Sequence, residues 1–97
     1  MLVVNIDFFR KEAKKFFKDW KNYNTGIGCK FFDVEKVLSS YGRTEENVIL
    51  ARAQHIIAVI LGFRKWNDLI LASDDVLKQA ASVLIYNFRI DNGTQRG

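Results

Sequence analysis

The 97-residue chain contains no proline, one cysteine and one histidine. Because proline interrupts helices and is common in loops, its absence favours a helical chain. A single cysteine, Cys29, excludes an internal disulfide and a multi-cysteine metal site, and it suits a reducing compartment. The longest apolar stretch, 56–63, is far shorter than the roughly 20 residues that cross a bilayer. The first residues also lack the basic flank and cleavage site of a signal peptide. We therefore expect a cytoplasmic protein with no membrane partner.

The composition is that of a globular chain, with 48% hydrophobic and 27% charged residues. Ninety-seven residues suffice for one core. We expect a single helical domain over 1–90 and a disordered tail over 91–97. The net charge of +4 has an uneven origin: residues 1–30 contain seven Lys or Arg against three Asp or Glu, and residues 31–97 contain eight of each. All the surplus positive charge therefore lies in the first third of the chain.

Hydrophobic periodicity predicts a first helix over 6–21, with Asn5 as its cap. At 100° per residue, its apolar side chains fall within an arc of about 100°. They are Ile6, Phe9, Ala13, Phe16, Phe17 and Trp20. The remaining face is basic and is a candidate surface for nucleic acid or a partner: Arg10, Lys11, Lys14, Lys15, Lys18 and Lys21. We expect Glu12 and Asp19 to interrupt this positive field.

The middle of the chain predicts a loop over 22–28, a helix over 32–41 stopped by Gly42, and a third helix that ends at Gly62. Thr44 and the two glutamates after it are typical of a helix start. Over 48–61, apolar residues point in nearly every direction around the third helix. A helix of this kind that is too short for a membrane is expected at the buried centre of a bundle.

Two further helices are predicted near the carboxyl end. A short one over 65–71 would bury Trp66, and a longer one follows the capping Ser73 and runs to Arg89. The inward residues of the longer helix are Leu77, Ala80, Ala81, Leu84 and Phe88, and the outward ones are Lys78, Gln79, Ser82 and Arg89. No segment alternates in the manner of a strand. The fold class is therefore expected to be all-α, a compact bundle of four to five helices with a buried central helix.

Residues 51–69 combine an alanine-spaced helix with a Gly-aromatic-x-x-Trp-x-x-Leu turn. The matching positions are Ala53, Ala58, Gly62, Phe63, Trp66 and Leu69. This pattern resembles the helical domain attached to bacterial glyoxalase-related proteins, which also occurs in small stand-alone chains. That module often has a Ser-His pair where this chain has Ile49 and Leu50, so no role of the histidine transfers here. The resemblance implies a fold and supplies no activity.

Catalysis would have to use Cys29 and His55, the one thiol and the one imidazole of the chain. Lys30 and the neighbouring Gly-rich loop could lower the pKa of Cys29, but a structural role for both residues is favoured. The spacing of His, Cys and carboxylates fits no zinc site, and Thr25 to Gly28 fits neither phosphate-binding fingerprint. We expect no catalytic, cofactor or metal site.

Two kinds of macromolecular contact remain. The basic face of the first helix, with Lys30 nearby, could follow the phosphates of a nucleic acid, although such a face is also the ordinary solvated side of a helix. Several aromatic residues do not all fit the inward arcs: Phe8, Tyr23, Phe31, Phe32 and Tyr86. Some of them could dock a protein partner or a second copy. The sequence favours a non-enzymatic accessory or regulatory module acting through protein contacts, with nucleic-acid binding as the alternative.

Overall fold

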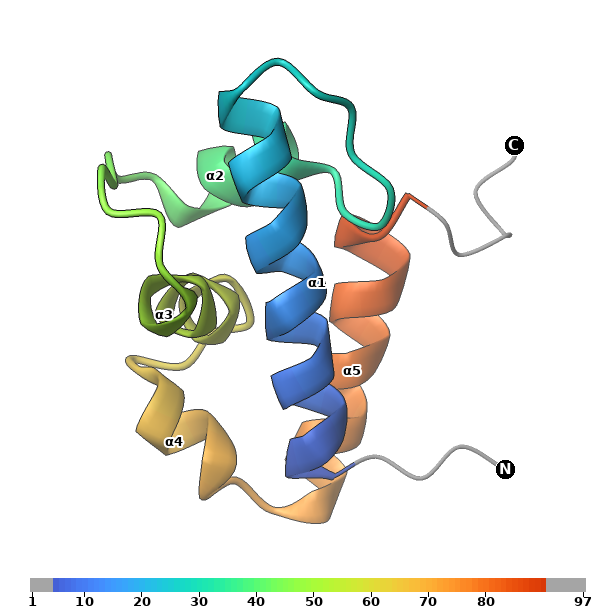
Figure 1. The fold of residues 1–97 in the computed structure, drawn as a ribbon. Helices are drawn as coiled ribbons and strands as arrows, with labels where there is room; N and C mark the ends of the chain where they lie inside the picture. Colours follow the sequence, from blue (N-terminus) through green and yellow to red (C-terminus); the bar gives the residue numbers. More distant parts are fainter. Residues whose placement is uncertain (1–4, 91–97) are drawn as a thin grey trace.

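The computed structural model describes residues 5–90. Five helices follow one another along the chain (Figure 1): α1 (Ile6–Asn24), α2 (Val34–Tyr41), α3 (Leu50–Ile60), α4 (Trp66–Ile70) and α5 (Asp74–Phe88). Within the described residues no strand forms, and an isolated antiparallel bridge joins Phe32 to Arg89. The expected all-α bundle is confirmed. The predicted tail over 91–97 lies outside the described residues.

Helix α1 stands between α3 and α5 in Figure 1, and α3 crosses it steeply. Helix α3 contacts α1, α2 and α4, so it is the central element of the packing. One buried cluster joins α1, α2 and α3 with the end of α5, around Trp20 and Ile56. A second cluster joins the start of α1 to α3, α4 and α5, around Phe9 and Leu69. The two clusters fix all five helices to one another.

The start and stop signals act largely as expected. The side chains of Asn5, Asp33 and Ser73 each accept the backbone N–H three residues later, which caps α1, α2 and α5. Gly42 ends α2 with a φ of +75°, and Gly62 follows α3 with a φ of +96°. A side chain at either position would be strained in this left-handed conformation. The five inward residues predicted for α5 are all buried.

Helix α3 differs from its prediction at its start. It begins at Leu50, after an Ile49 that provides no side-chain cap, and not at Thr44. The carboxylate of Glu45 accepts the N–H of Asn47 at 3.3 Å and the Nε of Arg52 at 2.8 Å. These contacts tie the irregular segment before Leu50 to the first turn of α3.

The central helix is also less enclosed than its apolar pattern predicts. Ala53, Ile56, Ile57 and Ala58 are buried, whereas Ala51 is exposed. The chain before α3 is irregular and leaves this side uncovered. Apolar residues on all sides of a helix therefore did not require partners on all sides.

Candidate basic interface on the first helix

One side of α1 presents a row of exposed cations, Arg10, Lys11, Lys14, Lys18 and Lys21. We call these five residues the basic face. At 100° per residue they occupy an arc of about 100°, and at 1.5 Å per residue they extend over about 16 Å. The exposed Asp7 shares this arc and lies 3.9 Å from the ammonium of Lys11. An exposed pair of this kind contributes little to stability.

The two acidic residues expected to interrupt the basic face are turned into the interior, which corrects the sequence analysis. Glu12 is 2% exposed and Asp19 is 0% exposed. The carboxylate of Asp19 accepts three backbone N–H groups, from Lys30 at 3.0 Å and from Phe31 and Phe32 at 2.7 Å each. Because a buried carboxylate is costly unless it is hydrogen-bonded, these donors explain its position. They also fix residues 30–32 beside α1, with the Lys30 side chain exposed.

Glu12 connects the two ends of the described chain. Its carboxylate accepts hydrogen bonds from the Nη1 of Arg89 and, at 3.3 Å, from the Nζ of Lys15. The Arg89 side chain is 12% exposed, so the expectation that it points outward is wrong. Lys15 was predicted to belong to the exposed basic face. Because it contacts Glu12, it is half-buried and is not part of that face. Neither Glu12 nor Asp19 is therefore exposed among the remaining five cations.

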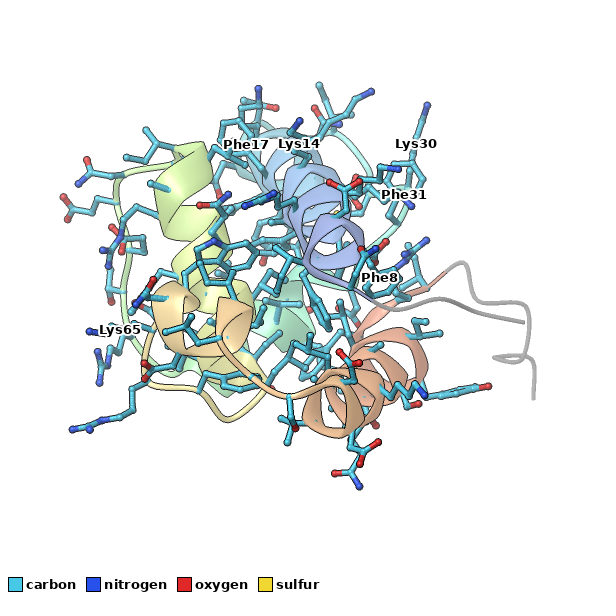
Figure 2. All side chains as sticks on the ribbon, turned by 90° about the horizontal axis from the view of Figure 1, so that it is seen from below. Phe8, Lys14, Phe17, Lys30, Phe31 and Lys65 are labelled. Carbon is cyan, nitrogen blue, oxygen red and sulfur yellow. The ribbon has the colours of Figure 1, made fainter. Side chains whose placement is uncertain are left out.

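Half-buried aromatic rings border the basic face on both sides. Figure 2 shows Lys14 pointing outward between Phe17 on one side of α1 and Phe31 on the other. The ammonium of Lys21 lies 4.4 Å from the Phe17 ring centre, and that of Lys15 lies 5.4 Å from the Phe31 ring centre. Such contacts attract cations to ring faces. The rings therefore attract lysine side chains at the two borders of the basic face.

The buried acids could have been recognised in the sequence. At 100° per residue, Glu12, Phe16 and Asp19 fall within about 60° of one another. That position marks them as neighbours of the apolar arc and not as part of the basic one. What periodicity cannot supply is their partners, because Arg89 lies 77 residues beyond Glu12.

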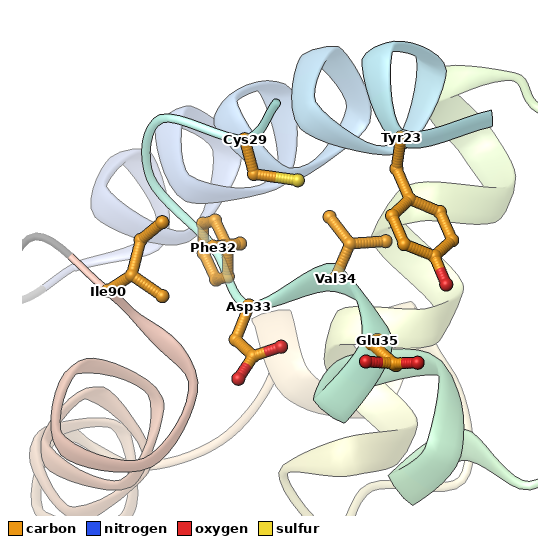
Figure 3. Close-up of a pocket in the computed structure, with 7 residues that line it drawn as sticks. All are labelled: Tyr23, Cys29, Phe32, Asp33, Val34, Glu35 and Ile90. Carbon is orange, nitrogen blue, oxygen red and sulfur yellow. The ribbon is translucent and has the colours of Figure 1, made fainter. Parts of the chain in front are cut away.

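Cys29 lies in an open pocket of about 260 Å³ beside α1, with its thiol 3.8 Å from the Asp19 carbonyl oxygen (Figure 3). The lining residues are Tyr23, Cys29, Phe32, Asp33, Val34, Glu35 and Ile90. Burial and, after it, the negative charge of Asp19 raise the pKa of the Cys29 thiol above its ordinary value of 9.0. The expectation that Lys30 lowers this pKa is therefore wrong. A protonated thiol is a poor nucleophile.

His55 has a different set of neighbours. Its ring lies edge-on to Tyr41, with 6.0 Å between ring centres. Burial lowers its pKa, and the positive charges of Arg52 and Arg43 lower it further. None of these neighbours is among those of Cys29. Within residues 5–90 no three His, Cys, Asp or Glu side chains are grouped to hold a metal ion, and no helix is long and apolar enough to cross a membrane.

The residues that carry the resemblance to the glyoxalase-related helical module lie at the junction of α3 and α4. Ala53, Ala58 and Leu69 are fully buried. Phe63 and Trp66, which follow Gly62, are half-buried. Phe63 packs against the cluster around Phe9 and Leu69, and Trp66 packs against both clusters. The motif therefore has a packing role here, and the family resemblance itself stays a prediction. No family model, no curated protein and no solved structure matches this chain.

Proposed function

We propose that this chain binds nucleic acid through the basic face of α1, with Lys30 as an additional contact. The observation that carries the proposal is the burial of Glu12 and Asp19. It leaves five exposed cations and one exposed acid, Asp7, on this side of α1. The difference of five and one gives the face a charge of about +4. A sequence pI near 9.4, together with cations gathered along one helix, is the electrostatic pattern of nucleic-acid-binding domains.

The chemistry of the face favours phosphates over bases. Four of its five cations are lysines, which act as point charges and contact phosphates without reading base edges well. Its length of about 16 Å corresponds to about five nucleotide steps of 3.4 Å along a duplex strand. The bordering rings are half-buried and each already has a lysine near its centre. We therefore expect binding that depends strongly on salt and weakly on sequence.

A fluorescence anisotropy titration tests this function with short labelled duplex and single-stranded DNA and RNA. If about four phosphates are neutralised, the slope of log Kobs against log salt is about −3.6, which weakens binding about 150-fold between about 50 and 200 mM salt. Absence of binding to all of these probes at low salt would contradict the proposal.

Charge reversal on the face provides the local test. The variant Lys14→Glu/Lys18→Glu is expected to raise Kd at least about tenfold at low salt and to make the slope shallower by about 2. The matched control is Lys65→Glu/Lys78→Glu, which changes the net charge equally at exposed positions away from α1. Lys65 lies well away from Lys14 in Figure 2. An equal loss in both variants would show that net charge, and not this face, governs binding.

The expectation that the chain acts through protein contacts remains a prediction. Of the aromatic residues named for such contacts, Tyr23 and Tyr86 are exposed and Phe32 is fully buried.

A further inference from the structure

The pocket that contains Cys29 is built by three segments that are distant from one another in the sequence. Tyr23 comes from the last turn of α1, and Ile90 follows α5. Between them, residues 29–35 connect α1 to α2 and enter the first turn of α2. Figure 3 shows Cys29 and Phe32 between Ile90 on one side and Tyr23 on the other. The pocket is therefore a product of the tertiary fold, and its lining is separate from the basic face.

Backbone hydrogen bonds fix the walls of this pocket. The N–H of Asp33 donates to the Phe88 carbonyl at 2.9 Å, and the N–H of Ile90 donates to the Phe31 carbonyl at 2.9 Å. These two bonds tie the end of α5 to the segment that precedes α2. The pocket is therefore formed before any ligand binds, as is usual for small-molecule sites.

The deepest residues that line the pocket are apolar. Phe32 is 0% exposed and Val34 is 1% exposed, so both are anchored in the core. At the rim, Tyr23 is 40% exposed and Ile90 is 44% exposed. A ligand that covers the two rim residues removes apolar surface from water, which is favourable. We therefore expect the occupant to have an apolar body.

The charged side chains that line the pocket are both acidic, Asp33 and Glu35. In the described part of the chain, neither carboxylate forms an ion pair. Asp33 accepts the Lys36 N–H at 3.1 Å, which caps α2, and Glu35 lies in the first turn of α2. The positive end of a helix dipole is equivalent to about half a charge, so it leaves most of the two negative charges uncompensated.

The thiol in the pocket reports this negative charge. Burial is the first cause of the raised pKa of Cys29, and the negative charges of Asp19 and Asp33 raise this pKa further. The chain as a whole has a net charge of +4, so the negative field is a local feature of the pocket. Such a field repels phosphates and carboxylates and attracts cations.

We propose that this pocket binds a small organic cation that has one aromatic ring and a short chain ending in a protonated amine. The ring packs against Tyr23 and Phe32, where aromatic contacts add to the gain from burial. The ammonium lies beside Asp33 and Glu35, which Figure 3 shows along one edge of the pocket. The volume of about 260 Å³ is below the about 300–1,000 Å³ that is typical of sites for drug-sized ligands, so the occupant is small.

An NMR titration of the full chain with phenethylammonium tests this proposal. The amide signals of residues 29–35 are expected to shift and to saturate with a Kd of about 1 mM, the affinity expected of a ligand with about nine non-hydrogen atoms. Phenylacetate has the same ring with the opposite charge, and ethylammonium has the charge without the ring. Both are expected to bind at least about tenfold more weakly, because each lacks one of the two interactions. Absence of saturable shifts, or equal binding of phenylacetate, would overturn the proposal.

The variant Asp33→Asn/Glu35→Gln tests the two carboxylates. Asparagine also caps helices well, so the fold is expected to remain intact. The Kd for phenethylammonium is expected to rise at least about tenfold, because the loss of each ion pair weakens binding by about threefold or more. The matched control Asp74→Asn/Asp75→Asn removes two exposed acids from the first turn of α5 and is expected to leave this Kd within about twofold. Equal weakening in both variants would show that net charge governs binding and would overturn the pocket as the site.

Alkylation with N-ethylmaleimide tests the location of binding. The chain has one cysteine, so the reagent adds its group at the pocket. The alkylated chain is expected to lose binding of phenethylammonium, whereas Cys29→Ser treated with the same reagent is expected to retain it. Mass spectrometry verifies complete alkylation, and circular dichroism verifies that both proteins remain folded. An unchanged Kd after complete alkylation would place the cation elsewhere and overturn the proposal.

Discussion

Helices α1 and α5 are alike on the inside and different on the outside. Both bury one stripe of aromatic, aliphatic and alanine side chains, from Phe9 to Trp20 in α1 and from Leu77 to Phe88 in α5. Outside, α1 presents five cations, and the last turns of α5 present amides, hydroxyls and apolar groups. The core does not require this difference, because both helices pack into it through their inward residues.

Solubility does not explain the contrast either. A helix needs a polar outer side, and mixed charges would provide one on both helices. Instead, Glu12 and Asp19 of α1 are buried. In α5, Val83 and Tyr86 are exposed to solvent. The two outer surfaces therefore differ in what they suit: the concentrated positive charge of α1 suits a polyanion, and the uncharged last turns of α5 do not.

The largest expected effect on stability comes from removing the buried carboxylate of Asp19, which distinguishes α1 from α5. Asp19→Ala leaves three backbone N–H groups of residues 30–32 without their acceptor. Hydrogen bonds to charged groups contribute about 1.5–3 kcal/mol each, so we expect the free energy of unfolding to fall by at least about 3 kcal/mol. Urea denaturation measures this change.

Asp7→Ala is the matched control, since Asp7 is an exposed aspartate of the same helix in a pair of 3.9 Å. We expect a change within about 0.5 kcal/mol there. Equal effects of the two variants would mean that Asp19 is a surface residue, and the basic face would then be interrupted as the sequence suggested.

A smaller effect is expected at the ion pair that joins the two helices. Glu12 of α1 accepts from Arg89, which follows α5, and both side chains are nearly buried. Glu12→Gln and Arg89→Gln are each expected to lower the free energy of unfolding by about 2–3 kcal/mol, because each removes one charge of a nearly buried ion pair.

The double variant Glu12→Gln/Arg89→Gln distinguishes the loss of this ion pair from destabilisation that each substitution causes independently. We expect it to be more stable than the sum of the single effects predicts, by about 1–2 kcal/mol. Additive losses would show that the two residues act independently and that α1 and α5 are not coupled here.

Periodicity was sufficient for most of the fold. The caps at Asn5 and Ser73, the stop at Gly42 and the five inward residues of α5 all depend on neighbours within about one or two helical turns, which a sequence displays directly. The exposure of the basic face was also predicted from spacing, except that Lys15, which was predicted to belong to it, is half-buried. Its aromatic borders were not recognised, because Phe31 reaches α1 from another segment.

What escaped prediction depends on distant partners. Arg89 looked like an outward cation because its acceptor, Glu12, lies 77 residues away. Asp19 looked like an interruption of the basic face because the three N–H groups that bind it come from a loop. Local sequence patterns therefore predict which side of a helix is apolar. Tertiary contacts determine which charged side chains remain exposed on the other side.

The smallest expected effect concerns a region outside both helices. His55 of α3 has a pKa lowered from 6.5 by burial and by Arg52 and Arg43, so the folded state favours the neutral ring. As pH falls through 6.5, the unfolded chain takes up the proton first. Stability is therefore complete above this pH and declines below it, until the folded ring is protonated too.

Because the chain has one histidine, this decline between about pH 7.5 and 5.5 is attributable to His55, as carboxylates titrate mainly below that range. We expect thermal melting of the parent chain to shift down slightly over this interval and that of His55→Gln to stay level. Melting that rises on acidification would mean that the folded state favours the charged ring. A pH dependence that persists in His55→Gln would show that His55 is not the cause of the decline.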